Sequence, residues 1–258
     1  MSGPDWAVPY ITKRDGEQGV PESMLSLRYN RAGRPIGIRY THELARNRDD
    51  RDVLWARVSQ DLSPRTMRPV GKPLFALMHP ARQRETMAAL RCQVCHGQPS
   101  RNKLGYLFLE MAGHAEVEGI VTAQPPVCLD HAVAGINDCR RLHERGYVLL
   151  RSKVPRLHGV IGQVFRAVGH QIEALPPLLH DDGSDYPIPY TRGDLMPYVL
   201  ASQLVRRLTG VTLVDIDAEL EAAGRDRLAI RRGAGTRCPA HRAPSLRACT
   251  SRTASGSP

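Results

Sequence analysis

Two pairs of metal-binding side chains constrain this chain more than any other feature of its sequence. Cys92 and Cys95 form a Cys-x2-Cys pair, and 32 residues later Cys128 and His131 repeat the same two-residue spacing. Thiolates and imidazoles at this double spacing are the usual ligands of a structural zinc site. Because three thiolates and one imidazole fill a tetrahedral shell, no open position remains for a catalytic water. The sequence therefore predicts a closed, structural Zn²⁺ site at these four residues.

The cysteines are expected to be reduced, because the chain has the character of a cytosolic protein. No segment approaches the roughly 18 consecutive apolar residues of a membrane helix. The N-terminus also lacks the basic segment followed by an apolar one that marks a secretory signal. Disulfides are rare in a reducing cytoplasm, so metal binding is the expected use of the thiols and no membrane partner is expected.

Three other interpretations of the cysteines stay open. A thioredoxin-like redox pair would occupy a strand-to-helix turn, whereas here a helix is expected before Cys92 and a strand after Cys95. The thiols could also be structural residues that bind no metal. Finally, Cys238 and His241 could supply the distal ligands if the C-terminal segment folds back.

The basic character of the chain is concentrated at its C-terminus. The net charge is +10, yet the segment from Arg225 to the end holds eight arginines and a single acid, Asp226. This segment is rich in Arg, Ala, Gly, Ser and Pro and has too few apolar residues to form a core. Residues 225–258 are therefore expected to be a disordered basic tail.

Local patterns predict a mixed α+β domain over residues 25–174, preceded by an extended lead-in at 1–24. The segments 25–29 and 36–40 alternate between apolar and polar residues, and Gly33 lies in the turn between them. Two alternating runs joined by turn residues predict a β-hairpin.

Two helices are expected before the first cysteine pair. A short helix within 41–60 should end near Gln60, where its apolar residues cluster. A second helix should run from Pro80 to about Leu90, because proline is favoured in the first turn of a helix. His79 immediately precedes this helix and is expected to cap or pack rather than to bind metal.

The second half of the chain mixes strand and helix signals with a segment rich in Pro and Gly. Alternation predicts strands, and apolar residues three and four apart predict helices. The expected elements are a hairpin of strands 105–111 and 119–123, a helix from Cys128 to just before Gly146, a strand at 147–154, a loop or linker at 175–193, and a helical hairpin at 194–224.

The predicted order of cysteine turn, β-hairpin and helix, over about residues 90–145, resembles a treble-clef zinc module. This resemblance implies that two ligands come from the Cys-x2-Cys turn and two from the first helical turn. Cys128 and His131 fit, since residues three apart share a helix face. Cys139 would lie roughly 16 Å further along a continuous helix, so it is assigned to the core.

Treble-clef modules also frame the HNH endonucleases, so a diverged HNH-like metal-dependent endonuclease is an alternative function. That family uses a histidine at the end of the first hairpin strand, then an asparagine, then a metal-binding histidine on the helix. Here His114 falls in a turn, and no asparagine occurs between Asn102 and Asn137. If His131 binds zinc, His143 lies three turns too far along. No catalytic residue is therefore assigned.

The preferred function is that of a non-catalytic zinc protein with a regulatory or nucleic-acid-associated binding role, and a purely protein-binding scaffold is the other alternative. DNA or RNA would bind through phosphate contacts, which depend on salt more than on sequence. The predicted helices at 194–224 carry acidic residues, so they are expected to pack on the first domain or on another protein. The candidate phosphate contacts are the Arg-rich tail and five residues around the first cysteine pair, Arg82, Arg84, Arg91, Arg101 and Lys103.

Four stretches within about residues 65 to 160 are similar to a group of proteins from high-GC actinobacteria. This resemblance supports a zinc module but implies no activity, since the group has no assigned function. The stretches are His79-Pro-Ala-Arg-Gln-Arg-Glu-Thr-Met, Leu90-Arg-Cys-Gln-Val-Cys95, Tyr106-Leu-Phe-Leu and Gln124-Pro-Pro-Val-Cys128.

Overall fold

The structure, a computed structural model, describes residues 8–113 and 117–225. Within these ranges the protein is a mixed α+β fold with four α-helices and an eight-stranded sheet, which confirms the predicted class. No helix in the described ranges is long and apolar enough to span a membrane. The tail predicted to be disordered lies outside the described residues from position 226 onward.

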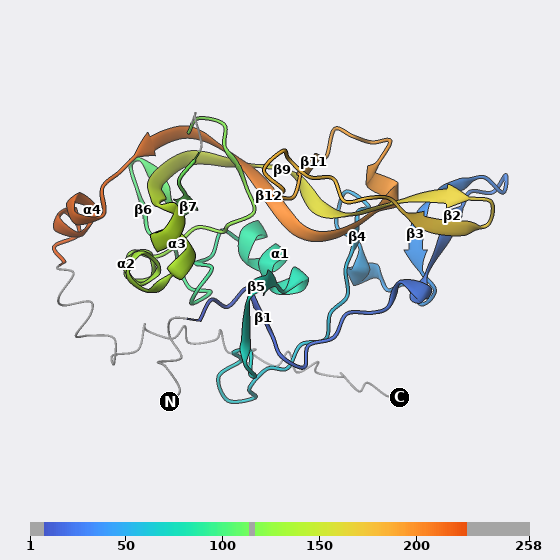
Figure 1. The fold of residues 1–258 in the computed structure, drawn as a ribbon, viewed down its shortest axis with the longest axis horizontal. Coiled ribbons are helices and arrows are strands. Elements are labelled where there is room, and N and C mark those ends of the chain that lie inside the picture. Colours follow the sequence, from blue (N-terminus) through green and yellow to red (C-terminus); the bar gives the residue numbers. More distant parts are fainter. Residues whose placement is uncertain (1–7, 114–116, 226–258) are drawn as a thin grey trace, which may run out of the picture.

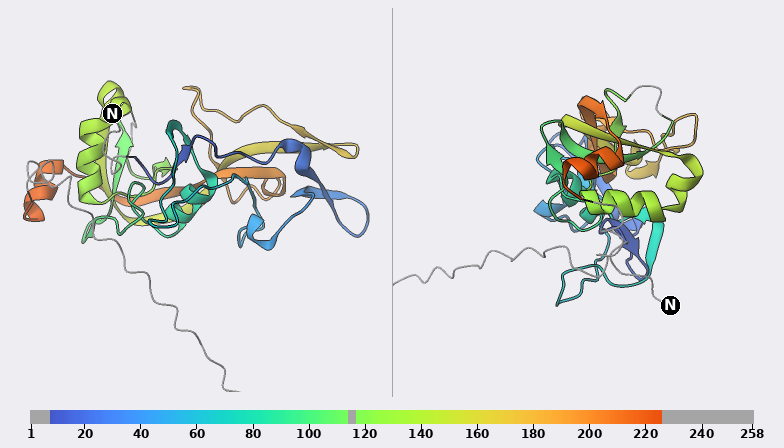
Figure 2. Two further views of the ribbon diagram at one scale, coloured as in Figure 1. Left: turned by 90° about the horizontal axis from the view of Figure 1, so that it is seen from below. Right: turned by 90° about the vertical axis from the view of Figure 1, so that its left-hand side faces the viewer.

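Two long antiparallel strands, β9 (Tyr147–Val168) and β12 (Val199–Leu213), form the centre of the sheet and run along the molecule (Figures 1 and 2). The strand predicted at 147–154 is therefore only the first part of β9. The glycine-containing remainder of β9 belongs to the same strand because glycine lets backbones approach closely. A Cβ atom on Gly162 would lie 2.3 Å from the Leu200 carbonyl oxygen of β12.

The helical hairpin predicted at 194–224 is wrong in its first half, which is the 3-10 turn η4 (Met196–Tyr198) followed by β12. Ala201 pairs with Gly162 and Gln203 pairs with Ile161, so one residue of β12 bulges out between them. The bulge breaks the strict alternation of a strand. The buried residues then fall three and four apart, which imitates the spacing of a helix.

One end of the molecule, called the helical end, holds β7 (Gly105–Met111), which pairs with β9 and with the short strand β6 (Arg101–Asn102). Helices α2, α3 and α4 pack at this end (Figure 1). Their bounds are Leu129–Asp138, Arg140–Arg145 and Ile216–Ala222.

The helix predicted from Cys128 to Gly146 ends where expected but is broken in the middle. Cys139 is extended, with ψ of 106°, and separates α2 from α3. The second predicted C-terminal helix is confirmed as α4. Asp215 caps it by accepting the backbone N–H groups of Asp217 and Ala218.

The hairpin predicted between 105–111 and 119–123 is wrong in its second strand. Both edges of β7 are already occupied, one by β6 and the other by β9. The segment that was expected to pair with β7 instead forms β8 (Val121–Thr122), which pairs with β12. Across this junction the Thr122 hydroxyl donates a hydrogen bond of 2.7 Å to the buried Glu110 carboxyl.

The opposite end, called the hairpin end, contains the predicted hairpin of β2 (Leu25–Tyr29) and β3 (Pro35–Tyr40), which is confirmed. The helix expected within 41–60 is wrong, since this segment holds only the turn η3 (Ala45–Asn47) and strand β4 (Leu54–Trp55). The Asp49 side chain stops a helix here, because its carboxylate accepts backbone N–H groups two and four residues on.

Further strands complete the sheet. Strands β10 (Gln171–Ala174) and β11 (Ile188–Pro189) both pair with β9, and β4 pairs in parallel with β12. Apart from β11 and an isolated bridge between Leu179 and Asp185, the segment 175–193 is irregular, in keeping with the predicted loop.

Helix α1 (Pro80–Ala88) lies between the two ends, where it was predicted. His79 caps it as expected, because its ring Nδ1 accepts the N–H of Arg82 at 3.4 Å. The lead-in contributes strand β1 (Thr12–Arg14), which pairs with β5 (Pro73–Met78) and includes two buried residues. Strand β1 is thus integrated with α1 and β5.

Candidate metal centre

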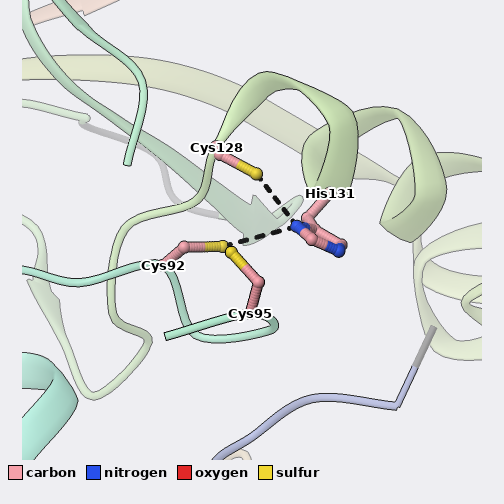
Figure 3. Close-up of side chains that lie close together, drawn as sticks. All are labelled: Cys92, Cys95, Cys128 and His131. Atoms are coloured by element: carbon pink, nitrogen blue, oxygen red, sulfur yellow. Dashed lines mark hydrogen bonds between the residues drawn. The ribbon is translucent and has the colours of Figure 1, made fainter. Parts of the chain in front are cut away.

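The four predicted ligands converge at the helical end. Their donor atoms all lie within 4.8 Å of one another. The Nδ1 atom of His131 is 2.9 Å from the Cys128 sulfur and 3.8 Å from the Cys92 sulfur, and the Cys95 sulfur lies beside them (Figure 3). The fold therefore brings together two pairs that are far apart in the sequence.

The first pair is held by a tight turn that follows α1. The carbonyl of Cys92 accepts the N–H of His96 at 2.8 Å, and the N–H of Cys92 donates to the Gly97 carbonyl at 2.9 Å. His96 adopts a left-handed conformation with φ of 59°, which turns the chain sharply. A side chain at Gly97 would place Cβ 3.3 Å from the Cys95 sulfur, so only glycine leaves that thiol uncrowded.

The second pair sits at the start of α2. Cys128 is the N-cap residue and His131 lies in the first turn, so both side chains point to the same side of the helix. The turn and the helix are joined directly by the backbone, because the N–H of Gln93 donates to the Pro126 carbonyl at 3.0 Å. This bond fixes the distance between the two pairs.

The site belongs to the hydrophobic core of the helical end. Cys92 is fully buried and His131 is 6 % exposed. The surrounding buried side chains come from the sheet and from helices α2 and α4 and include Leu107, Val133 and Leu220. The other two ligands, Cys95 and Cys128, are half-buried and pack against the same core. This packing against the core suits a structural role.

The N-terminal segment passes over the cysteine turn and is bonded to it. The N–H groups of Tyr10 and Ile11 donate to the carbonyls of Val94 and Gln93. His96 adds a side-chain link, since its ring lies 4.3 Å from the Tyr10 ring. The turn is thus held from one side by α2 and from the other by the lead-in.

His96 also ties the turn to α1, a role that the sequence interpretation missed. Its Nδ1 lies 3.0 Å from the Thr86 hydroxyl and its Nε2 lies 3.2 Å from a Glu85 oxygen. The only sign of this role in the sequence is that His96 directly follows the second cysteine. Only the folded α1 shows what its two nitrogens contact.

The pKa values of Cys92 and Cys128 are shifted in opposite directions by burial and by hydrogen bonds among the thiols. Burial raises the pKa of Cys92, but hydrogen bonds to its sulfur from Cys128 and Cys95 outweigh burial and hold this pKa well below its usual value. Hydrogen bonds with Cys92 and Cys95, together with burial, raise the pKa of Cys128. A bound cation would replace these shared protons, because metal ligation requires thiolates.

The donor set and its dimensions fit Zn²⁺. Zn–S and Zn–N bonds of about 2.3 and 2.0 Å place the ligand atoms of a tetrahedron roughly 3.5 to 3.8 Å apart. Of the two observed spacings from His131 Nδ1, 3.8 Å lies close to these values and 2.9 Å is shorter. Soft thiolates with an imidazole favour zinc over the hard cations magnesium and calcium. The four residues could therefore coordinate zinc after small side-chain movements.

As predicted, Cys139 does not belong to the cluster, although the helix that was expected to separate it from the cluster is not continuous. The continuous helix that was expected to carry it away from the site is broken at Cys139 itself. The residue is half-buried rather than part of the core, which corrects its predicted assignment. Cys238 and His241, the alternative distal ligands, lie outside the described residues.

The residues considered for a nuclease are not assembled with the cluster among the described residues. His143 lies on α3, and its Nε2 is 2.6 Å from the Ile136 carbonyl oxygen. His114, the other candidate, lies outside the described residues.

The five basic residues predicted to contact nucleic acid have different surroundings. Arg82 is fully buried and its guanidinium is paired with Glu17 at 2.9 Å. It is not available to a phosphate, which corrects its assignment. Arg84 lies over the Trp55 ring at 4.7 Å. For Arg91, which is half-buried, and for Arg101 and Lys103, which are exposed, nucleic-acid contact stays a prediction.

Of the two predicted C-terminal helices, which were expected to pack on the first domain or on another protein, only α4 is present. Glu219 of α4 is paired with Arg151 of β9 at 2.8 Å, and both side chains are buried. Arg151 also donates to the Gly105 carbonyl at 2.9 Å. The acidic helix thus docks on the sheet of its own chain through this pair.

No family model, no curated protein and no solved structure matches the chain. The resemblance to an actinobacterial group therefore stays a prediction.

Proposed function

We propose that this protein is a non-catalytic binding protein stabilised by one structural Zn²⁺ at Cys92, Cys95, Cys128 and His131. The observation that carries the proposal is the convergence of four soft donors from two distant segments within 4.8 Å. Bound zinc would supply a cross-link between the turn after α1 and the N-terminus of α2. The packing of the site against the core supports a structural ion over a catalytic one.

We further propose that this region is a treble-clef-like module. The chain order supports it, because the cysteine turn is followed by the β6–β7 hairpin and then by α2, whose first turn carries the second ligand pair. The hairpin differs from the one expected from the sequence, since its short strand precedes β7 instead of following it.

Metal analysis of the purified protein tests the zinc site. We expect one zinc per chain in the wild type and a loss of zinc in Cys92→Ser, Cys128→Ser and His131→Ala. Cys139→Ser makes the same chemical change outside the cluster and should keep its zinc. Absence of stoichiometric zinc from the wild type, after expression with added zinc, would refute the proposal.

We propose nucleic acid as the partner, bound near the hairpin turn that contains Arg101 and Lys103. Both side chains are exposed, and neither pairs with a carboxylate in residues 8–113 and 117–225. Arg101 lies over the Tyr106 ring at 4.8 Å, which orders the guanidinium without neutralising it. Such a group can bind a phosphate.

A salt titration of binding to short DNA duplexes and to single strands tests this partner. The double variant Arg101→Gln/Lys103→Gln should weaken binding and reduce the slope of log K against log salt by roughly 2. The control is the Arg140→Gln/Arg166→Gln variant, which removes two exposed arginines on other elements. If the two double variants behave alike, or if the wild type binds neither DNA at low salt, this partner is rejected.

A further inference from the structure

We propose that a cleft between α1 and the segments before and after β4 is a binding site for a small phosphate-bearing ligand of the nucleotide or pyrophosphate class. The cleft measures about 520 Å³ and is lined by three arginines, Arg46, Arg57 and Arg84. This volume lies within the range of about 300 to 1,000 Å³ that small-molecule sites occupy. None of the four metal ligands lines it.

The cleft is formed by three segments that are remote in sequence. An antiparallel bridge joins Gly19 to Val58, and the N–H of Ser59 donates to the Gln18 carbonyl at 2.9 Å. Helix α1 contributes Ala81 and Arg84, and the turn η3 contributes Arg46 and Asn47. The arginines are thus brought together only by the tertiary fold.

Two of the arginines are positioned by aromatic rings. The Arg84 guanidinium lies 4.7 Å from the centre of the Trp55 ring, and the Arg57 guanidinium lies 5.0 Å from that of Tyr40. Each donates one hydrogen bond to a backbone carbonyl, at 3.4 Å and 3.2 Å respectively. Ring stacking fixes a guanidinium but leaves its charge and most of its N–H groups available.

No carboxylate lines the cleft, and none in the described ranges forms an ion pair with its three arginines. The acids that stand nearest in sequence are used elsewhere. Glu17 pairs with Arg82, and Glu43 pairs with Arg48 at 2.7 Å. Asp49 accepts a hydrogen bond from Trp55 Nε1 at 3.2 Å without lining the cleft.

A concentration of positive charge without a protein anion indicates an anionic ligand. Arginine forks match the oxygens of a phosphate, and several of them around one cleft suit more than one phosphate group. The remaining polar lining residues, Gln18, Asn47, Ser59 and Gln60, add neutral hydrogen-bonding groups of the kind that bind a sugar or a base. These features favour a nucleotide or pyrophosphate over a simple monovalent anion.

Binding can be followed through the fluorescence of Trp55, which lines the cleft. The chain has two tryptophans, Trp6 and Trp55, so the Trp6→Phe protein reports on Trp55 alone. It would be titrated with inorganic pyrophosphate, ADP, adenosine and sodium sulfate at constant ionic strength. We expect pyrophosphate and ADP to change the emission saturably and adenosine to have no effect.

Variants distinguish binding in the cleft from general electrostatic attraction to a basic protein. Arg46→Gln and Arg57→Gln should each weaken pyrophosphate binding about tenfold or more, since each removes charge-assisted hydrogen bonds. The Arg46 side chain forms no hydrogen bond, ion pair or ring contact in the described ranges, so its replacement should leave the fold unchanged. Arg166→Gln, which removes the same charge from an exposed residue of β9, should bind like the wild type.

Several results would overturn the proposal. One is the absence of any saturable change at millimolar pyrophosphate or ADP. Another is equal binding by the Arg46→Gln and Arg166→Gln proteins, and a third is sulfate binding as tightly as pyrophosphate. Binding of a DNA duplex but not of ADP would also reject a small-molecule site.

The outcome does not depend on the function proposed above. The Arg101→Gln/Lys103→Gln variant should keep pyrophosphate binding unchanged, because neither residue lines the cleft. Loss of zinc and loss of DNA binding are read in separate experiments, so failure of one proposal leaves the others distinguishable.

Discussion

The two ends of the molecule share β9 and β12 but are stabilised differently. At the helical end the core is built around Cys92 and the other ligands, and it is covered by helices of six to ten residues. At the hairpin end the core consists of apolar and aromatic side chains such as Ile38, Tyr40 and Phe165. Both ends bury hydrophobic side chains, and at the helical end the proposed metal would add a cross-link to this burial.

Metal removal is expected to have the largest effect, and it tests whether the two ends of the molecule are stabilised differently. Chelation of zinc, or Cys128→Ser, should cost several kcal/mol of unfolding free energy, below the roughly 10 to 16 kcal/mol of isolated zinc-finger peptides. The loss is smaller because the sheet still packs without the metal. Hydrogen exchange should show lost protection in α2 and in residues 92–97, while β2 and β3 stay protected.

The matched control for metal removal is Cys139→Ser, which changes a half-buried thiol outside the cluster. It should keep wild-type protection throughout. Equal loss of protection at both ends after chelation would contradict the view that they are stabilised separately.

The next largest effects should come from two buried ion pairs. Glu219→Gln leaves Arg151 of the helical end without its counter-charge, and Glu17→Gln does the same to Arg82 of α1. Removing one partner of a buried pair typically costs about 3 to 5 kcal/mol. Urea unfolding should therefore show both variants strongly destabilised, with hydrogen exchange of α4 affected more by Glu219→Gln.

The double variant Arg151→Met/Glu219→Leu distinguishes the cost of an unpaired buried charge from the cost of losing the pair itself. It removes both charges at once, so it should be more stable than Glu219→Gln alone. If the single variant is as stable as the wild type, the pair does not anchor α4.

A pH dependence should follow from Glu110, which lies buried on β7. Burial raises its pKa to about 7, although the hydrogen bond from Thr122 acts in the opposite direction. The pKa of Glu110 in the folded protein exceeds the unfolded value of 4.5. Its contribution to the free energy of unfolding is therefore fully present below pH 4.5. It falls as the pH rises toward about 7, by about 1 kcal/mol per pH unit.

Glu110→Gln tests this dependence, because an amide keeps the shape of the protonated carboxyl and does not ionise. The difference in unfolding free energy between wild type and variant, measured in urea, should shift in favour of the variant between about pH 5 and pH 7. Parallel stability curves over this interval would show that the carboxyl does not titrate as described.

The smallest effect is expected at the exposed pair of Arg166 and Glu173, which joins β9 to β10. Solvent screens such pairs and their side-chain entropy opposes them. The Tm of Arg166→Gln should therefore equal that of the wild type in a thermal melt. A clear decrease would show that β10 relies on this contact.

Short-range sequence signals gave correct predictions at several helix starts and turns, although the local hydrogen bonds of Asp49, which stop a helix within 41–60, were missed. Pro80 and His79 defined the start of α1, and the turn around Gly33 joined β2 to β3. The ligand set was also predictable, because thiol and imidazole spacing reflects coordination geometry rather than the surrounding fold.

The errors arose where pairing partners decided the structure. Residues 119–123 were assigned to β7, but β9 and β6 occupy both edges of that strand. The bulge in β12 gave its sequence the spacing of a helix, and the glycines of β9 were interpreted as the end of that strand. In each case the decisive contact is with a strand far away in sequence, which no local pattern encodes.

The sequence by itself identified the four candidate metal ligands, because their chemistry depends on which atoms are present and how closely they are spaced. It also determined the helix caps and the first hairpin, which depend on neighbouring residues. Only the tertiary structure decided that Arg82 is buried against Glu17 and that Arg46, Arg57 and Arg84 surround a cleft. A charge becomes a structural pair or a free binding group according to what the fold places beside it, and that arrangement is set by long-range packing.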